Sequence, residues 1–160
     1  MRETSGSTVG KMIVCTMLIG VFAGAAGADH HGLVNVRSQY DVATTTNRLE
    51  EIVGKKGLTH FTTIDHAAGA TGVGESLAPT RVVVFGNPKI GTPLMRCNRT
   101  VAIDLPQKAL VWRDDTGVVW LSYNNPAYLN ARHGLAACAA VLEKVSGALA
   151  GLSAYATGSK

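Results

Sequence analysis

The chain has 160 residues and a formal net charge of +4, from 15 basic and 11 acidic side chains. This length predicts one domain. The small charge excess argues against a nucleic-acid partner, because Asp104, Asp114 and Asp115 interrupt the basic residues of the middle third and leave no continuous basic stripe.

Residues 1–28 have the pattern of a secretory signal peptide. Arg2 and Lys11 precede an uncharged stretch, 12–28, whose apolar part, MIVCTMLIGVFAG, is followed by AAGA. We therefore expect cleavage before Asp29 and a periplasmic or secreted chain that makes no stable membrane insertion afterwards. The alternative is an uncleaved anchor, but the run is shorter than the roughly 20 apolar residues of a spanning helix.

The rest of the chain predicts a mixture of strands and helices. In chain order we expect a strand over 33–40, a helix over 41–57, a strand over 58–65, a short helix or loop over 66–76, a strand over 81–86, a hairpin over 108–123, a short helix over 125–134 and a long helix over 135–152. The first helix has the clearest limits, because Asp41 can cap its start and Gly57 can supply a left-handed stop.

This order of elements, β-α-β-β-β-β-α with short helices between strands, predicts an α+β fold class. We expect a single domain over 33–150 with one mainly antiparallel sheet, packed by helices on one side. The continuous β-branched run at 81–86, RVVVFG, suits the centre of that sheet. Residues 151–160 are expected to form a flexible C-terminal tail.

The stretch FGNPKIGTPLM, residues 85–95, places two glycines and two prolines close together after the central strand. A phosphate-binding loop would require a lysine and then a hydroxyl residue after its second glycine, but Thr92 and Pro93 occupy those positions. A nucleotide site is therefore not expected.

The same stretch favours a double helix start. Asn87-Pro88 and Thr92-Pro93 each combine a capping residue with proline at the first helical position, so we expect a helix that runs on toward Asp104. Chain reversal alone explains this pattern. The functional alternative is that free N–H groups at the helix start collect an anion.

Two cysteines, Cys97 and Cys138, follow the predicted leader, and cleavage of the leader would remove Cys15. In an oxidising compartment they are a possible disulfide. The alternative for Cys138 is a buried thiol, because it lies in the apolar pattern LAACAAVL. The sequence leaves both alternatives open.

Four stretches, DHAAGA, FGNPKIGTPLM, IDLPQKALVW and WLSYNNPAYLNARHG, occur in this order and resemble the bacterial family called domain of unknown function 302. The resemblance implies a single α+β domain with an antiparallel sheet similar to half of the TATA-binding-protein fold. It implies no catalytic residue, because the family has no established activity. The family motif falls on Asp65, His66, Phe85, Gly86, Asn87, Pro88, Gly91, Thr92, Pro93, Leu94, Met95, Asp104, Leu105, Pro106, Tyr123 and Asn124.

We expect the polar residues of this motif to line one pocket at the strand ends. They are Asp65, His66, Asn87, Thr92, Asp104, Tyr123 and Asn124. A histidine near a carboxylate can act as a general base, so an enzyme that uses His66 and Asp104 is one alternative. The structural alternative is that Asp65 caps the helix that follows it.

A second candidate site depends on the cleavage point. A mature chain beginning Asp29-His30-His31 would offer a free amine, two backbone nitrogens and an imidazole, a square-planar set suited to Cu(II) or Ni(II). The alternative is a polar leader without a role. No cofactor is otherwise evident from the sequence.

These observations favour an exported, non-catalytic module that binds a small ligand, such as an anion or a metal, or another protein. The enzyme around His66 and Asp104 is the first alternative. An oligomerising module that pairs through a sheet edge or the alanine-rich helix is the second.

Overall fold

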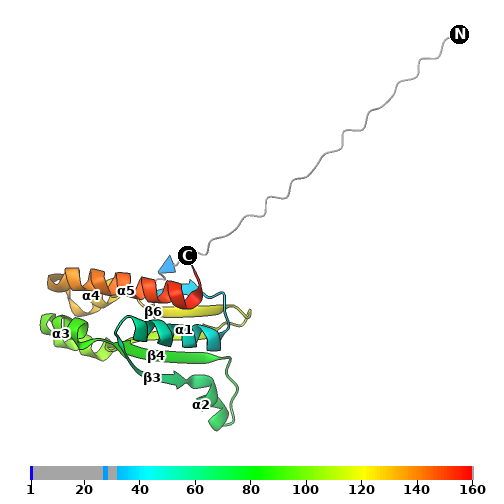
Figure 1. The fold of residues 1–160 in the computed structure, drawn as a ribbon, viewed down its shortest axis with the longest axis horizontal. Coiled ribbons are helices and arrows are strands. Elements are labelled where there is room, and N and C mark those ends of the chain that lie inside the picture. Colours follow the sequence, from blue (N-terminus) through cyan, green and yellow to red (C-terminus); the bar gives the residue numbers. More distant parts are fainter. Residues whose placement is uncertain (2–26, 29–31, 160) are drawn as a thin grey trace.

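The structure is a computed structural model that describes residue 1, residues 27–28 and residues 32–159. Six strands form one sheet, and helices pack over one of its faces (Figure 1). The strands are β1 Gly27–Ala28, β2 Leu33–Arg37, β3 Thr59–Asp65, β4 Thr80–Gly86, β5 Gln107–Arg113 and β6 Val119–Asn124. The helices are α1 Val42–Lys55, α2 His66–Gly72, α3 Pro88–Cys97, α4 Pro126–His133 and α5 Ala139–Thr157, with 3-10 turns η1 Arg99–Asp104 and η2 Ala136–Cys138.

The sheet has the order β1-β2-β6-β5-β4-β3, and every neighbouring pair is antiparallel. The predicted α+β class, with a mainly antiparallel sheet packed by helices on one side, is therefore confirmed. The run predicted for the sheet centre, β4, lies between β5 and the edge strand β3 instead. Its alternate residues Val83 and Phe85 are almost fully buried beneath the helices.

The helix-covered face of the sheet carries the hydrophobic core. Val111 of β5 and Leu121 of β6 meet Leu49 and Val53 of α1 there, and all four are at most 1% exposed. Strands β4, β5 and β6 bury alternate side chains in this layer, as the two-residue period of a strand requires. Helix α5 lies beside α1 over the same face (Figure 1).

Helix α1 begins and ends as predicted. Asp41 Oδ1 accepts a hydrogen bond from Thr44 N at 2.6 Å, which satisfies one of the free donors at the helix start. Gly57 has a φ of +67°, the left-handed conformation that glycine adopts without a Cβ clash.

Of the two predicted helix starts, the one at Asn87 is present and the one at Thr92 is wrong. Asn87 caps α3, but Thr92 and Pro93 lie inside this single helix, which ends at Cys97. Asn98 then caps the separate turn η1, so the helix does not continue to Asp104. Leu94, next to the proline, is 1% exposed, and Ile90 and Met95 pack against the core on either side of the proline.

The predicted flexible tail is also wrong, because α5 continues to Thr157. Leu152 and Ala156 are buried in the core. The guanidinium of Arg48 donates to the carbonyls of Tyr155 and Ala156, at 2.6 and 3.2 Å, and thereby holds the last turn of α5 on α1. Small residues separate the apolar residues at 151–160, so the sequence pattern does not reveal that this end of α5 is buried.

A disulfide joins Cys97 at the end of α3 to Cys138, the last residue of η2 directly before α5, with the two Cα atoms 6.4 Å apart. This separation lies within the range that a disulfide spans. Of the two alternatives left open by the sequence, the structure has the bridge.

The predicted leader lies largely outside the described residues, as does the candidate metal site Asp29-His30-His31. The last two residues of the predicted leader form β1, with Gly27 opposite Asn35 and Ala28 opposite Val34. Cleavage before Asp29 would therefore remove β1 and leave β2 as the edge of the sheet.

Within the described residues, one helical stretch is long and apolar enough to cross a membrane by length and composition, Ala136–Thr157. Its mean hydropathy is 1.3. In the fold this stretch contributes Leu142, Val145 and Leu149 to the core.

Candidate functional site

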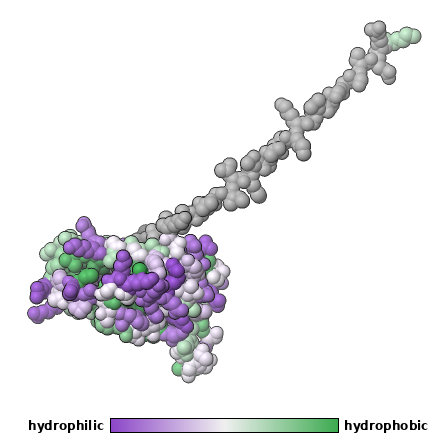
Figure 2. Space-filling view, viewed as in Figure 1, coloured by the Kyte–Doolittle hydropathy of each residue, from purple (hydrophilic) through white to green (hydrophobic). Residues whose placement is uncertain are grey.

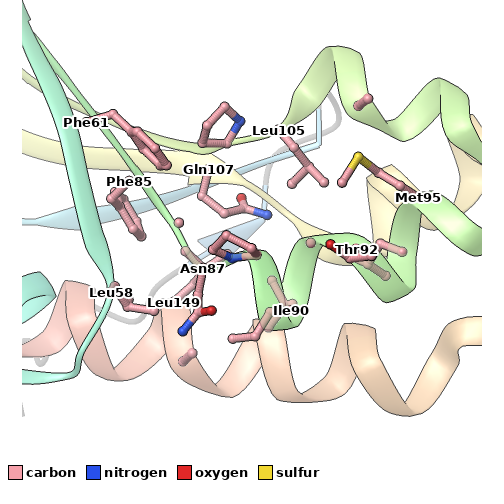
Figure 3. Close-up of a pocket in the computed structure, with 18 of the residues that line it drawn as sticks. Leu58, Phe61, Phe85, Asn87, Ile90, Thr92, Met95, Leu105, Gln107 and Leu149 are labelled. Carbon is pink, nitrogen blue, oxygen red and sulfur yellow. The ribbon is translucent and has the colours of Figure 1, made fainter.

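An apolar pocket of about 310 Å³ lies at the end of β4, between the sheet, α3, the turn after η1, and α5 (Figure 3). It is lined by Leu58, Phe61, Phe85, Gly86, Asn87, Pro88, Ile90, Gly91, Thr92, Leu94, Met95, Ala102, Leu105, Pro106, Gln107, Val145, Ala148, Leu149 and Leu152. Its volume lies at the lower end of the range for small-molecule sites. Apolar side chains also gather on the surface where α3, α4 and the start of α5 meet (Figure 2).

The two glycines of FGNPKIGTPLM allow the walls of this pocket to approach. A Cβ added at Gly86 would lie 3.4 Å from Pro106 Cβ and 3.6 Å from Phe61 Cε2. A Cβ added at Gly91 would lie 3.7 Å from Leu105 Cδ1. This stretch therefore ends the strand, begins α3 and leaves room for the turn that carries Leu105 and Pro106.

A β-bulge places Phe61 at the pocket. The pairing of β3 with β4 shifts register between His60 and Thr62, and bulges of this kind redirect a side chain. Phe61 contacts the Gly86 region and is 53% exposed, whereas Ile64 is 45% exposed further along the strand. The bulge explains why the apolar residues of this strand do not alternate regularly.

The chemistry of the lining is nearly all apolar. The polar side chains are those of Asn87, Thr92 and Gln107, and no charged side chain among the described residues lines the pocket. Asn87 already uses Oδ1 to accept the N–H of Lys89 at 2.9 Å. The site therefore favours an uncharged ligand, because a charge buried there would lose its hydration without a partner.

The start of α3 is not an anion site. Besides the bond from Lys89 N to the Asn87 side chain, the Asn87 carbonyl accepts Ile90 N at 2.9 Å and Gly91 N at 3.0 Å. Pro88 has no N–H. The donors that would attract an anion are thus used by the cap, and the functional alternative stated for this stretch has no support in the geometry.

Of the seven residues predicted to share a polar pocket, two, Asn87 and Thr92, line this one. The predicted polar pocket combines residues that the structure places at opposite ends of β4. Asp65 at the end of β3 pairs with Arg81 at the start of β4, whereas Asn87 follows the other end of β4. Because strands rise about 3.3 Å per residue, these positions lie roughly 20 Å apart.

Asp65 caps the helix that follows it, which is the structural alternative stated for this residue. Its Oδ1 accepts from Ala68 N at 3.0 Å, which caps α2, and its Oδ2 accepts from Arg81 Nε at 2.9 Å. The backbone bond and then the guanidinium hold the pKa of Asp65 below its ordinary value. Asp65 borders a separate polar cleft beneath α2, while His66 at the start of α2 is exposed.

Asp104 has a different histidine partner from the predicted one. Its Oδ2 lies 2.6 Å from His133 Nε2, and its Oδ1 lies 3.5 Å from Arg132 Nη1. The other ring nitrogen of His133 lies 2.9 Å from Thr100 Oγ1, and Asn98 Nδ2 donates to the His133 carbonyl at 2.7 Å. These contacts tie η1 to the end of α4, so the His66–Asp104 arrangement is wrong.

Tyr123 and Asn124 point to opposite faces of β6, because successive side chains of a strand alternate. Tyr123 is 6% exposed beneath α5, where burial raises the pKa of its phenol and a hydrogen bond with Ser153 acts in the opposite direction. Asn124 is opposite Leu33 of β2. Neither residue lines the pocket.

Sequence reasoning missed the apolar character of the site, although the signal was present. Most of the apolar and glycine or proline residues of the family motif line the pocket: Phe85, Gly86, Pro88, Gly91, Leu94, Met95, Leu105 and Pro106. Phe61, Gln107 and the α5 residues lie outside that motif. Among the described residues, no group of three His, Cys, Asp or Glu side chains could hold a metal ion.

The fold and site define a single α+β domain with an antiparallel sheet covered on one side and an apolar pocket at the strand ends. The chain belongs to the family described as Domain of unknown function DUF302, whose model matches residues 34–152.

Longer proteins also match this chain. The proteins named fluoride-specific ion channel FluC 1 in Brucella suis biovar 1 (strain 1330) and in Brucella abortus biovar 1 (strain 9-941) are each 45% identical to it over 118 residues. Those residues cover 72% of this chain but 46% and 44% of the relatives, so the chain spans about half the length of the curated relatives it matches.

A crystal structure shares the fold. The uncharacterized conserved protein DUF302 from Bacillus stearothermophilus superposes with a TM-score of 0.69 at 19% identity, over 76% of this chain and 94% of that one. At this identity the likeness concerns the fold alone.

Proposed function

We propose that this domain is a non-catalytic binding module for a small, uncharged and mainly apolar molecule. The observation that carries the proposal is the assembly of FGNPKIGTPLM and the Leu105-Pro106 turn into a pocket whose described lining residues carry no charge. An apolar pocket with few polar groups is the usual form of a small-molecule site. The proposal replaces the anion or metal expected as ligand.

The predicted leader supports an exported role for this module. A disulfide between Cys97 and Cys138 fits the same proposal, because disulfides persist in oxidising compartments. Detection of the chain in a periplasmic fraction, with its N-terminus determined by peptide sequencing, tests this part. A cytoplasmic chain that retains residues 1–28 would contradict it.

The binding proposal is tested by filling the pocket. Ala148 lines the pocket from α5 and is exposed, so Ala148→Phe adds a ring there without displacing a core residue. Ala150→Phe, on an exposed position of the same helix that does not line the pocket, is the matched control. The probe is N-phenyl-1-naphthylamine, an uncharged dye that becomes fluorescent in apolar sites.

We expect saturable dye fluorescence with the parent chain and with Ala150→Phe, and at least a tenfold weaker affinity with Ala148→Phe. Absence of saturable binding to the parent chain, or equal binding to both variants, contradicts the proposal. Circular dichroism of each variant shows whether it is folded.

A second proposal concerns the Brucella relatives, whose names describe fluoride-specific channels. We infer that the domain accompanies such a channel and does not itself hold fluoride, because the N–H groups at the start of α3 are used by its cap. Fluorine NMR of fluoride with the isolated chain should therefore show no saturable broadening. Saturable broadening would contradict this second proposal.

A further inference from the structure

We propose that the ligand of this pocket carries a flat, uncharged ring with one carbonyl or hydroxyl group, and that Gln107 is the residue that recognises this group. The inference rests on the proposed function and names its ligand class. It depends on the placement of two phenylalanines beside one carboxamide at the same end of the pocket.

The ring is inferred from Phe85 and Phe61. Phe85 is 2% exposed and lies at the inner end of the pocket, whereas Phe61 is 53% exposed. Figure 3 shows both rings on one side of the pocket, with Leu105 and Met95 on the other side. Aromatic rings associate in offset or edge-to-face pairs with centroids about 4.5–7 Å apart, which favours a flat ligand over a flexible chain.

The polar group is inferred from Gln107. Gln107 lies directly opposite Phe85 on the neighbouring strand, so the two side chains project from the same face of the sheet. Its carboxamide lies between the phenylalanines and Leu105 in Figure 3. Gln107 is half-buried, and within the part of the chain that the structure describes its carboxamide has no protein hydrogen-bond partner.

The other polar groups of the lining are poorer candidates. Asn87 uses its oxygen for the helix cap, and Thr92 is exposed. A carboxamide offers both donors and an acceptor but no charge, so it pairs with a carbonyl or a hydroxyl and does not neutralise a carboxylate. Fatty acids and other anions are therefore disfavoured as ligands.

The test compares three molecules with the same ring system: 1-naphthol, naphthalene and 1-naphthoate. Isothermal titration of the parent chain should rank their affinities in that order. One hydrogen bond contributes about 1 kcal/mol, so naphthol should bind about fivefold more tightly than naphthalene. Naphthoate should bind most weakly.

Gln107→Met keeps the length of the side chain and removes the carboxamide. In this variant the affinity for naphthol should fall to that for naphthalene, while the affinity for naphthalene stays unchanged. Thr62→Val, at an exposed position of β3 that does not line the pocket, is the matched control and should leave the ratio of the two affinities as it is in the parent chain.

The outcomes separate the two proposals. Equal binding of naphthol and naphthalene by the parent chain overturns the assignment of Gln107 and leaves the apolar pocket intact, and this comparison needs no variant to fold. Tightest binding of naphthoate overturns the uncharged ligand class. If neither naphthalene nor N-phenyl-1-naphthylamine binds, the proposed function itself fails.

Discussion

At the scale of single residues, the β5–β6 turn depends on the carboxylate of Asp114. Its Oδ1 accepts from Thr116 N and Val118 N, both at 2.9 Å, and its Oδ2 accepts from Trp120 Nε1 at 2.8 Å. These bonds, with that from Trp120 the largest, lower the pKa of Asp114 from 3.8 to about 2. Gly117 completes the turn with a φ of +87°.

This lowered pKa predicts a pH dependence of stability. The folded state stabilises the ionised carboxylate of Asp114. Its contribution to the free energy of unfolding is therefore complete above pH 3.8 and is lost as the pH falls toward about 2. Asp114→Asn should therefore melt below the parent chain at neutral pH, and the difference should shrink across this acid range. Thermal melts at several pH values measure it, and a difference that is constant with pH would contradict the assignment.

Residue chemistry also shows what the sequence supports by itself. Asp41, Asp65, Asn87 and Gly57 act within a few residues of their own positions, and all four have the capping roles that their local patterns indicate. The pocket residues could not be assigned in the same way. Phe61 reaches the pocket because of a β-bulge, and the sequence of β3 does not predict this bulge.

At the scale of elements, α3 packs against η1, η2 and α5, and the disulfide ties its last turn. The bridge closes a loop with a sequence separation of 41. Since cross-linking restricts the unfolded chain, the chain-entropy model gives about 4 kcal/mol for a loop of this size.

We therefore expect Cys97→Ala with Cys138→Ala to lower the free energy of unfolding by about 2–4 kcal/mol. Urea denaturation measures this value. The parent chain treated with a reductant is the control and should unfold at the same urea concentration as the double variant. A midpoint that the reductant leaves unchanged would show that the bridge contributes nothing.

The end of α5 is the second test at this scale. Leu152 is 4% exposed, and it would be solvated in a flexible tail. Truncation of a buried leucine removes apolar contacts and leaves a cavity, so Leu152→Ala should cost about 2–5 kcal/mol. Gly151→Ala, at an exposed position next to it, should instead be neutral or mildly stabilising. Equal urea midpoints for Leu152→Ala and the parent chain would favour the tail.

At the scale of the whole molecule, the position of the pocket follows from the antiparallel order of the strands. The element types and the α+β class could be predicted from periodicity and capping, because these signals are local. The meeting of β4's end with β5's start depends on pairing between distant residues, such as Phe85 with Gln107. For the same reason the sequence predicts one pocket for His66 and Asn87, although the two residues lie at opposite ends of β4.

The most direct test of the account is to map where an uncharged apolar probe binds. Amide shifts of the nitrogen-15-labelled parent chain, titrated with N-phenyl-1-naphthylamine, report contact along the whole backbone. We predict saturable shifts in 85–95, 105–107 and 145–152, which surround the pocket. Shifts confined to the polar cleft beneath α2 or to the uncovered face of the sheet, or no shifts at all, would contradict the central claim.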